Sequence, residues 1–391
     1  MNILIIGEWY SSNLGDGIIC QNVKKLIEEA YKRKDLVIDK ADISCRDSFM
    51  NETAIIEHKK TKLYLKKILY KSEYLTYKLQ DLKRKMKIKK ICKKKYDIAI
   101  FAGGHLIMPY FTFQICDYIK YLSENKTKII INACGVGKFK SKILKQKIKV
   151  ALKNPNIIAI SSRDDIEKLK KEYISEERSS IIKKTYDPAI YTDETYRISR
   201  KENSQVIGLG IMKLLNVSDE EVIKFWKGVI KQLETQGQKW QFFCNGALED
   251  YRLACRCLKD IKNNKYDKKV YIASRPNRPE ELVKIISKYK SLISFRLHSH
   301  IVAYSLEIPT VAIVWDDKVK TFFEDLRLKD RCFDIDEKPE KIVEKLLEIK
   351  DVDYNQKLKK RQKEIIINNL KENLEEESNF IDNSKTTNVT K

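Results

Sequence analysis

The sequence lacks the long apolar runs that mark membrane-spanning and secreted chains. None of its stretches approaches eighteen consecutive apolar residues, so no segment is expected to span a membrane. Its first seven residues form a short apolar run that meets Glu8 at once, without the basic start and longer apolar stretch of a secretory signal. We therefore expect a cytoplasmic protein.

Cysteine and histidine are too few and too scattered to indicate a metal site. The nine Cys are odd in number and lie mostly in apolar runs, which is typical of reduced thiols. Cys255 and Cys257 are two residues apart, but no second pair and no nearby His completes a zinc site. The four His include His298 and His300, whose spacing suits a metal but which lack a third ligand. We expect no bound metal.

Composition instead indicates a globular protein with two cores and a strong positive charge. A chain of 391 residues exceeds what one hydrophobic core usually serves, and 42% hydrophobic residues are enough for two. The net charge of +23 favours acidic partners such as nucleic acid, anionic lipid headgroups, nucleotides or anionic glycans. Charge alone does not choose among them.

Short Ile-rich runs alternate with segments of helical period through both halves of the chain. Such runs predict buried strands of parallel sheets, joined by βαβ crossovers. The predicted strands are Asn2–Gly7, Tyr96–Gly104, Lys128–Gly135, Ile157–Ser162, Gln205–Ile211, Trp240–Asn245, Lys269–Ala273, Ser291–Leu297 and Thr310–Trp315. The clearest helices between them are Asp16–Tyr31, Val217–Gln236 and Pro279–Tyr289.

This alternation predicts an α/β fold of two Rossmann-like, doubly wound domains that face a cleft, as in GT-B glycosyltransferases. We expect an N-terminal domain over residues 1–190, on the acceptor side, and a C-terminal domain over 200–337, on the donor side. The polar stretch 187–204 is the predicted linker. Residues 338–391 are expected to form a helical segment with a frayed tail.

A basic segment interrupts the first domain, in an insert expected at about residues 55–95. Lys59–Lys95 holds sixteen Lys or Arg against two acids, and apolar residues recur there at helical spacing, at Leu65, Ile68, Leu75, Leu79, Leu82 and Met86. A basic amphipathic helix follows, either as the solvated face of an insert or as a surface that adsorbs to an anionic membrane. Nucleic acid is not favoured, because no aromatic platform or known DNA-binding motif accompanies the charge.

The first candidate site follows the first strand, where Asn13-Leu-Gly15-Asp16 opens a helix. Glycine allows close approach of a ligand, and a helix N-terminus offers free N–H groups to an anion, although Asp16 could equally be a simple N-cap. Gly103-Gly104 forms a similar turn after a later strand, structural or ligand-facing. Neither fits the dinucleotide-binding glycine pattern, and Gly135-Val-Gly137-Lys138 does not fit a Walker A loop.

The strongest candidate is Arg296-Leu-His298 at the end of an apolar strand. If the chain is extended there, both side chains point to the same side. A guanidinium binds a carboxylate or phosphate with two parallel hydrogen bonds, while an imidazole transfers protons. The alternative is that His298 only caps the following helix. Lys318 ends the next strand, where it could reach a phosphate or be an ordinary surface lysine.

The order of these motifs resembles the polysaccharide pyruvyl transferase family over roughly residues 1–325. The resemblance rests on Asn13-x-Gly15-Asp16, Gly103-Gly104, Ser162-Arg163-Asp164, Asp187-Pro188, Arg296-Leu297-His298 and the run Pro309–Lys318. Two features depart from it. His105 stands where the family commonly has a third Gly, which puts that loop's contact with the ligand in doubt. The basic insert is longer than a minimal member needs, which indicates a special acceptor or location.

The resemblance implies transfer of pyruvate from phosphoenolpyruvate to a sugar of a bacterial surface polysaccharide or its lipid-linked precursor, as a ketal. It implies His298 as the acid, Asp16 as a base toward the acceptor, and Arg296, Lys318 and Arg163 as ligands of the donor. The backbone at Asn13, Gly15, Gly103 and Gly104 would approach the substrates. No metal or cofactor is required, and the enzyme would work in the cytoplasm, in peripheral contact with the inner face of the membrane.

Two other functions fit the sequence. A GT-B glycosyltransferase that uses a nucleotide sugar also needs a basic donor pocket in its second domain. A non-catalytic scaffold on the membrane surface would be built around the basic helix, and its lipid binding would survive loss of Arg296 and His298. Protection of the folded protein by phosphoenolpyruvate, but not by nucleotide sugars, distinguishes the transferase.

Overall fold

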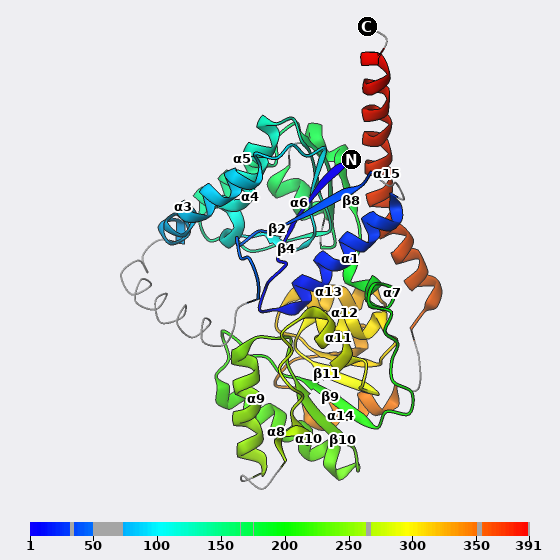
Figure 1. Ribbon diagram of the computed structural model, residues 1–391. Helices are drawn as coiled ribbons and strands as arrows, with labels where there is room; N and C mark the ends of the chain where they lie inside the picture. Colours follow the sequence, from blue (N-terminus) through cyan, green and yellow to red (C-terminus); the bar gives the residue numbers. More distant parts are fainter. Residues whose placement is uncertain are drawn as a thin grey trace. The chain divides into compact units, whose positions relative to one another are not determined.

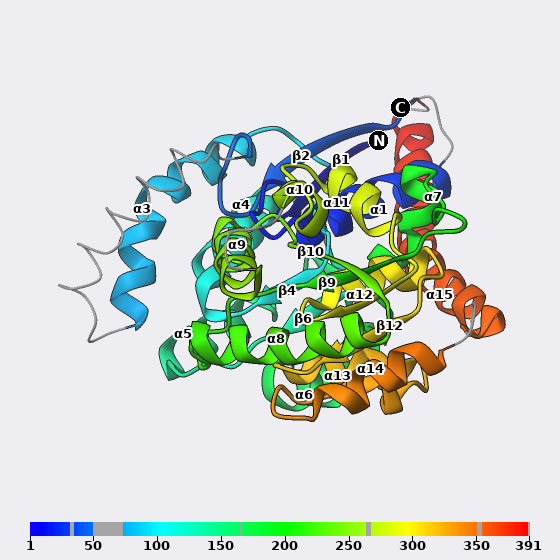
Figure 2. The same ribbon diagram turned by 90° about the horizontal axis from the view of Figure 1, so that it is seen from below.

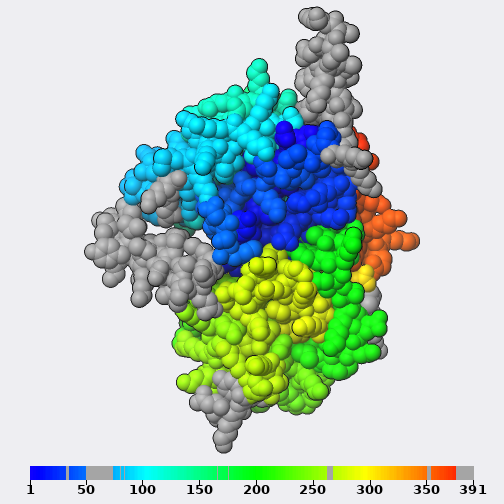
Figure 3. All heavy atoms as spheres, viewed as in Figure 1, coloured from blue at the N-terminus to red at the C-terminus, as the bar shows by residue number. Residues whose placement is uncertain are grey.

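A computed structural model describes residues 1–31, 35–49, 73–164, 166–174, 176–262, 267–349 and 354–389. The chain forms two compact units (Figures 1 and 3). Unit 1 comprises Met1–Ser11, Ile19–Pro188 and Arg361–Lys391, and unit 2 comprises Ser12–Ile18 and Ala189–Lys360. The crossing after Pro188 falls inside the predicted linker, but the transfer of Ser12–Ile18 to unit 2 was not predicted.

Unit 1 is built on a parallel sheet with the strand order β2-β1-β3-β5-β7-β8, beside a small parallel pair, β4-β6. The strands are β1 (Asn2–Gly7), β2 (Val37–Asp42), β3 (Ile98–Phe101), β4 (Gly104–Ile107), β5 (Lys128–Ile131), β6 (Cys134–Val136), β7 (Ile157–Ser162) and β8 (Ile182–Lys184). The central strands are apolar on both faces, as expected for a sheet that helices cover on each side.

Helices cover both faces of this sheet. They are α1 (Leu14–Ala30), α3 (Glu73–Ile91), α4 (Thr112–Glu124), α5 (Lys142–Ala151), α6 (Ile166–Tyr173) and α15 (Gln356–Val389). Side chains of α3, α4, α5 and α6 share one core with Leu4, Ile6 and Phe101. The other face meets α1, where Gly7 leaves room for the Sγ atom of Cys20. Short 3-10 turns join the elements at Pro109–Phe111, Glu176–Ile181 and Pro188–Tyr191.

Unit 2 repeats the design with a parallel sheet of order β10-β9-β11-β12-β13. Its elements are α7 (Thr192–Tyr196), β9 (Val206–Gly210), α8 (Asp219–Thr235), β10 (Lys239–Phe243), α9 (Leu248–Lys262), α10 (Lys268–Tyr271), α11 (Pro279–Ile286), β11 (Ser291–Ser294), α12 (Leu297–Ser305), β12 (Thr310–Ile313), α13 (Asp317–Asp325), β13 (Cys332–Phe333) and α14 (Pro339–Glu348). Helices α8 and α14 pack side by side (Figure 2) and share a core with α9 and one face of the sheet.

Several predicted strands differ from the observed elements. The run predicted as one strand over Lys128–Gly135 divides into β5 and β6, which belong to different sheets, and Tyr96–Gly104 contains only β3 and the first residue of β4. Lys269–Ala273 is mostly the short helix α10, because the Asp267 carboxylate caps it by accepting the Lys269 N–H at 2.9 Å. Only an isolated bridge joins Ile272 to Phe242. The strand predicted over Ser291–Leu297 ends at Ser294, and Leu297 already begins α12.

The basic helix is present from Glu73 to Ile91 as α3, and its predicted part over residues 59–72 lies outside the described residues. At the other end of the chain, α15 continues through the predicted frayed tail to Val389. All nine cysteines are free thiols. In the described part of the chain, no helix is both long and apolar enough to cross a membrane.

Candidate active site

Polar residues gather where the parallel strands of unit 2 end. The carboxyl ends of parallel strands share one edge of a sheet, and α/β folds bind ligands at that edge. Lys213 follows β9, Asn245 follows β10, Arg296 follows β11 and Lys318 follows β12. These four strands are consecutive neighbours in the sheet, so the edge carries a row of cationic and amide groups.

Arg296 is held by a carboxylate that the sequence did not indicate. Its Nε donates to Oδ2 of Asp250 at 3.1 Å, and its Nη2 donates to the same atom. The other oxygen of Asp250 accepts the Lys213 N–H at 2.9 Å. Asp250 is buried, whereas the Arg296 side chain keeps 20% of its surface exposed. The guanidinium is therefore oriented from one edge and presents its remaining donors elsewhere.

His298 lies in the first turn of α12, not in an extended strand. Arg296 is the extended N-cap residue and Leu297 starts the helix, so the predicted placement of both side chains on one side of a strand is wrong. His298 is buried, and its ring lies directly against Gly15. A Cβ atom at Gly15 would be 2.3 Å from Cγ and Nδ1 of His298. Only glycine leaves room for the imidazole at this point.

The segment Ser12–Ile18 brings the first predicted motif into unit 2, beside His298. Asn13 precedes the first residue of α1, and its Nδ2 donates to Oδ2 of Asp16 at 3.0 Å. Asp16 is therefore inside the first helical turn and is not the N-cap. The sequence motifs Asn13-x-Gly15-Asp16 and Arg296-x-His298, nearly three hundred residues apart, meet within one unit.

Asn245 secures this segment to the sheet edge. Its carbonyl accepts the Leu14 N–H at 2.9 Å, and its Oδ1 accepts the Ser299 hydroxyl at 2.8 Å. Gly246 follows with a φ of +105°, and a Cβ there would lie 2.7 Å from both Leu14 Cγ and Ser12 O. The Asn245 side chain is buried, and its Nδ2 has no hydrogen-bond partner among the described residues. An Asn before Gly at a strand end was the available signal.

Lys318 and one further cation, Arg275, complete the sheet edge. The Nζ of Lys318 lies 4.4 Å from the ring centroid of Trp315, whose Nε1 donates to the Phe295 carbonyl at 2.7 Å. This contact links the end of β12 to the residue before Arg296. Arg275 donates from Nη1 to the Gly246 carbonyl at 2.9 Å, close to the Asn245 end of the edge. Arg275 belongs to a polar loop and carried no sequence signal.

His300 has a structural role. It is completely buried between two strand ends, with Nε2 2.9 Å from the Ser294 carbonyl and Nδ1 2.7 Å from the Thr310 hydroxyl. A carbonyl only accepts, so Nε2 carries the proton and Nδ1 accepts from Thr310. Burial lowers the pKa of His300 to about 3 and keeps the ring neutral. These bonds fix the turn that carries Arg296 and His298.

The other predicted residues belong to unit 1. Arg163 follows β7 and forms a buried ion pair with Asp187, so its guanidinium is already partnered. Gly103 and Gly104 form the turn between β3 and β4 with φ angles of +115° and +86°, which favour glycine. His105 packs against the next loop, with Nε2 3.1 Å from the position of a Cβ on Gly137.

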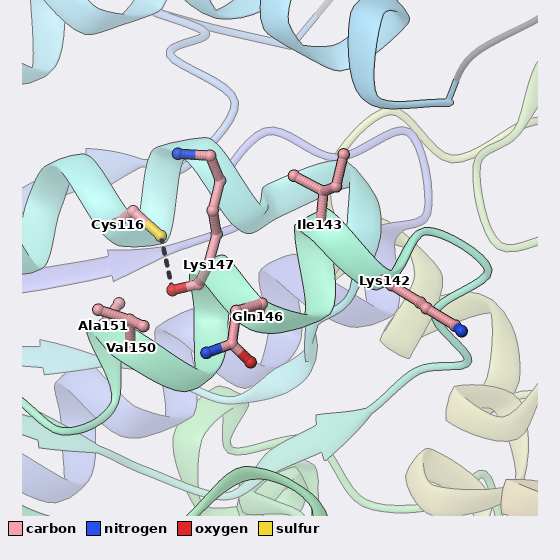
Figure 4. A pocket seen from close by; sticks show the side chains of 7 residues that line it. All are labelled: Cys116, Lys142, Ile143, Gln146, Lys147, Val150 and Ala151. Carbon is pink, nitrogen blue, oxygen red and sulfur yellow. Dashed lines mark hydrogen bonds between the residues drawn. The ribbon is translucent and has the colours of Figure 1, made fainter.

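Unit 1 also carries a shallow hollow of about 670 Å³ that holds no predicted site residue (Figure 4). It is formed by α4 and α5, and its lining residues are Cys116, Lys142, Ile143, Gln146, Lys147, Val150 and Ala151. Across the described part of the chain, no group of three or more His, Cys, Asp or Glu side chains is arranged to hold a metal ion.

Solved structures of several sugar-nucleotide enzymes share the fold. The UDP-GlcNAc 2-epimerase of Methanocaldococcus jannaschii is 14% identical, with a TM-score of 0.57 over 94% of this chain and 99% of that chain. The UDP complex of MnaA from S. aureus is 11% identical, with a TM-score of 0.55 over 93% of this chain and 91% of that chain. At this identity the likeness shows the fold alone, which is α/β with parallel sheets and GT-B-like.

The sequence itself matches a family. No curated relative matches the chain. Residues 13–317 match the sequence pattern of the family described as polysaccharide pyruvyl transferase. The matched residues include the Asn13-x-Gly15-Asp16 and Arg296-x-His298 motifs and extend to the start of α13. The match covers well over half of the sequence and extends through both units. The chain therefore belongs to the polysaccharide pyruvyl transferase family.

Proposed function

We propose that this protein transfers pyruvate from phosphoenolpyruvate to a sugar of a surface polysaccharide or its lipid-linked precursor, as a ketal. The observation that carries the proposal is the packing of the His298 ring on Gly15, beside Arg296 at the sheet edge. A proton donor, an oriented guanidinium and the Asp16 carboxylate then lie in a single unit. This set matches the needs of an anionic enol donor and a hydroxyl acceptor.

The proposed reaction balances without a metal, an oxidant or a cofactor. His298 protonates the methylene carbon of phosphoenolpyruvate, and C2 becomes an oxocarbenium ion. A sugar hydroxyl bonds to C2 and gives its proton to Asp16. The C2–O bond to phosphate then breaks, a second hydroxyl bonds to C2, and its proton leaves with phosphate. Asp16 then releases its proton to solvent and His298 takes one up, so the enzyme returns to its starting state. A positioned acid of this kind contributes about 10²–10⁴-fold to the rate.

The remaining residues are proposed to bind the donor's negative charges. Arg296 offers the donors that Asp250 leaves free, and Lys318 offers an ammonium from the first turn of α13, the helix that follows the next strand. The Nδ2 of Asn245 is a buried donor whose unmade hydrogen bond is costly unless a ligand oxygen accepts it. In unit 1, Arg163, Gly103 and Gly104 stay proposed substrate contacts, although Arg163 would have to share its guanidinium with Asp187.

Thermal unfolding with added ligand tests the donor. Phosphoenolpyruvate should raise the melting temperature, while a nucleotide sugar such as UDP-GlcNAc should not. Protection by the nucleotide sugar alone would favour the glycosyltransferase alternative and overturn the proposal. His298→Ala should keep the donor protection and lose transfer, because an acid acts mainly in the transition state. The transfer is measured as pyruvate ketal on the native glycan by mass spectrometry.

A further inference from the structure

Helix α3 carries an exposed row of apolar side chains on the surface of unit 1. Leu79, Leu82 and Met86 are 52%, 62% and 72% exposed. At 3.6 residues per turn, these three side chains fall within about 60° of the helix circumference. Large apolar residues that line up on an exposed helix face mark a surface for association.

The opposite side of α3 is the one that packs on the protein. Ile88 and Asp81 are buried there, and the Arg84 Nη2 donates to the Tyr110 hydroxyl at 2.9 Å. The Tyr77 ring stacks edge-on against Tyr110 at 5.7 Å. These contacts fix α3 against α4 and the turn before it, so the exposed row is not needed for packing within unit 1. It is directed away from the core.

Lysines border the row on both sides. Lys78, Lys85 and Lys89 lie along one side and Lys90 along the other, and all four are exposed. Over the whole helix, seven Lys or Arg stand against two acids. An apolar strip between lysines is the pattern of helices that lie in a bilayer surface, with apolar side chains among the acyl chains and ammonium groups at the phosphates.

We propose that α3 inserts its apolar row into an anionic membrane surface, with the bordering lysines bound to lipid phosphates. Charge favours an anionic membrane over a second copy of the protein, because two copies of α3 in contact would both be positively charged and would repel each other. The nearby hollow on α4 and α5 (Figure 4) adds exposed Ile143 and Val150 between lysines on the same helical layer. Membrane insertion would bring the enzyme to a lipid-linked acceptor, and this interpretation rests on the proposed function.

Sedimentation of the full chain with vesicles tests the proposal. The protein should bind vesicles of equal parts phosphatidylglycerol and phosphatidylcholine but not phosphatidylcholine alone. A Leu79→Gln, Leu82→Gln, Met86→Gln variant should bind about tenfold or more weakly, because three apolar side chains no longer leave water. A Lys85→Gln, Lys89→Gln, Lys90→Gln variant should lose most of its binding at low salt.

Matched controls separate this surface from general effects. Leu215→Gln with Val270→Gln replaces exposed apolar residues of unit 2 and should leave vesicle binding unchanged. Lys224→Gln with Lys231→Gln does the same for exposed charge on α8. All variants should unfold at the wild-type temperature, since the replaced side chains are exposed. If the wild type stays in the supernatant at low salt, or the apolar variant binds as well as the wild type, insertion by α3 is wrong.

Failure of this proposal and failure of the proposed function are distinguishable. Donor protection by phosphoenolpyruvate reports on unit 2 and should be the same in the wild type and both α3 variants. Vesicle binding without donor protection would leave the α3 surface standing and remove the transferase chemistry. Donor protection without vesicle binding would do the reverse.

Discussion

Adding one methyl group at Gly15 should displace His298. The new Cβ would lie 2.3 Å from Cγ and Nδ1 of His298 and 2.4 Å from its Cβ. Carbon atoms in contact are about 3.5–4.0 Å apart, so the new Cβ and the His298 side chain have to move apart by more than about 1 Å. Because the Cβ of His298 is among the close atoms, turning the ring is not enough. The first turn of α12 or the loop before α1 must shift.

The two consequences have different sizes. Overpacking of this kind costs about 1–3 kcal/mol of stability, against a gain of about 1 kcal/mol for replacing Gly by Ala inside a helix. The net loss of stability should therefore be about 2 kcal/mol or less. A displacement of about 1 Å at a catalytic group lowers the rate by about 100-fold. The Gly15→Ala variant should thus stay folded and lose most of its turnover.

Gly228→Ala is the matched control. Gly228 also lies in a helix of unit 2, and its added Cβ would be 2.6 Å from Cγ of Pro339, far along the chain from the site motifs. Both variants are compared by thermal unfolding and by phosphate release from phosphoenolpyruvate with native glycan acceptor. Gly228→Ala should lose stability but not turnover. Wild-type turnover in Gly15→Ala, or equal losses in both variants, would refute the role given to the Gly15–His298 contact.

Three other changes should have equally specific effects. Arg296→Lys should weaken donor protection in thermal unfolding, because an ammonium cannot reproduce the planar fork; unchanged protection would count against Arg296 as a ligand. Asp250→Asn should slow transfer more than it weakens donor binding, since the amide keeps only one acceptor oxygen for the two groups that donate to Asp250, Arg296 and the Lys213 N–H, and so loosens the orientation of Arg296; a loss of affinity alone would contradict this. His300→Gln should flatten the pH dependence of stability. Burial lowers the pKa of His300 from 6.5 to about 3, so between these pH values the unfolded chain binds a proton that the folded protein does not. The stability of the wild type should therefore fall as the pH drops from 6.5 to about 3. If the wild type and the variant lose stability in parallel over this range, His300 does not cause the pH dependence.

Local patterns predicted the framework of the fold because burial acts on contiguous residues. The Ile-rich runs at Asn2–Gly7 and Ile157–Ser162 are strands with the predicted bounds, since a parallel strand covered on both faces is mostly apolar. The strand β2 was missed because it lies at the sheet edge, where Val37–Asp42 alternates apolar and charged residues too weakly. Edge strands need less burial and leave less signal.

The site partners could not be predicted because they depend on contacts between distant residues. Asp250 lies in the first turn of α9, where an acid of any role favours the helix dipole, so its position in the sequence does not indicate a site residue. Its contact with Arg296 requires β10 and β11 to lie on either side of β9. The place of Ser12–Ile18 in unit 2 likewise follows from the Leu14 N–H bond to Asn245 and the close approach at Gly246, which no local spacing encodes.

The same limit explains the two faces of α3. Its heptad-like spacing of Leu75, Leu79, Leu82 and Met86 is what a helix with one buried face shows, and spacing cannot say whether protein or another phase covers that face. In the structure the contacts with the rest of unit 1 come from the half-buried Tyr77 and the buried Ile88 instead.

The run from Ser294 to His300 contains both residues that stabilise the fold and residues that are proposed to act on the substrate. Phe295 and His300 are buried and anchor the turn, the first in the core and the second by hydrogen bonds to two strand ends. Arg296 stays partly exposed because Asp250 satisfies only one edge of its guanidinium. His298 has its place because residue 15 has no side chain. The strand ends at Ser294 and the helix begins at Leu297, so the turn between them sets the positions of Arg296 and His298. Substitutions at the anchoring residues Phe295 and His300 should therefore impair function by displacing these two side chains, not by changing the charge of the site.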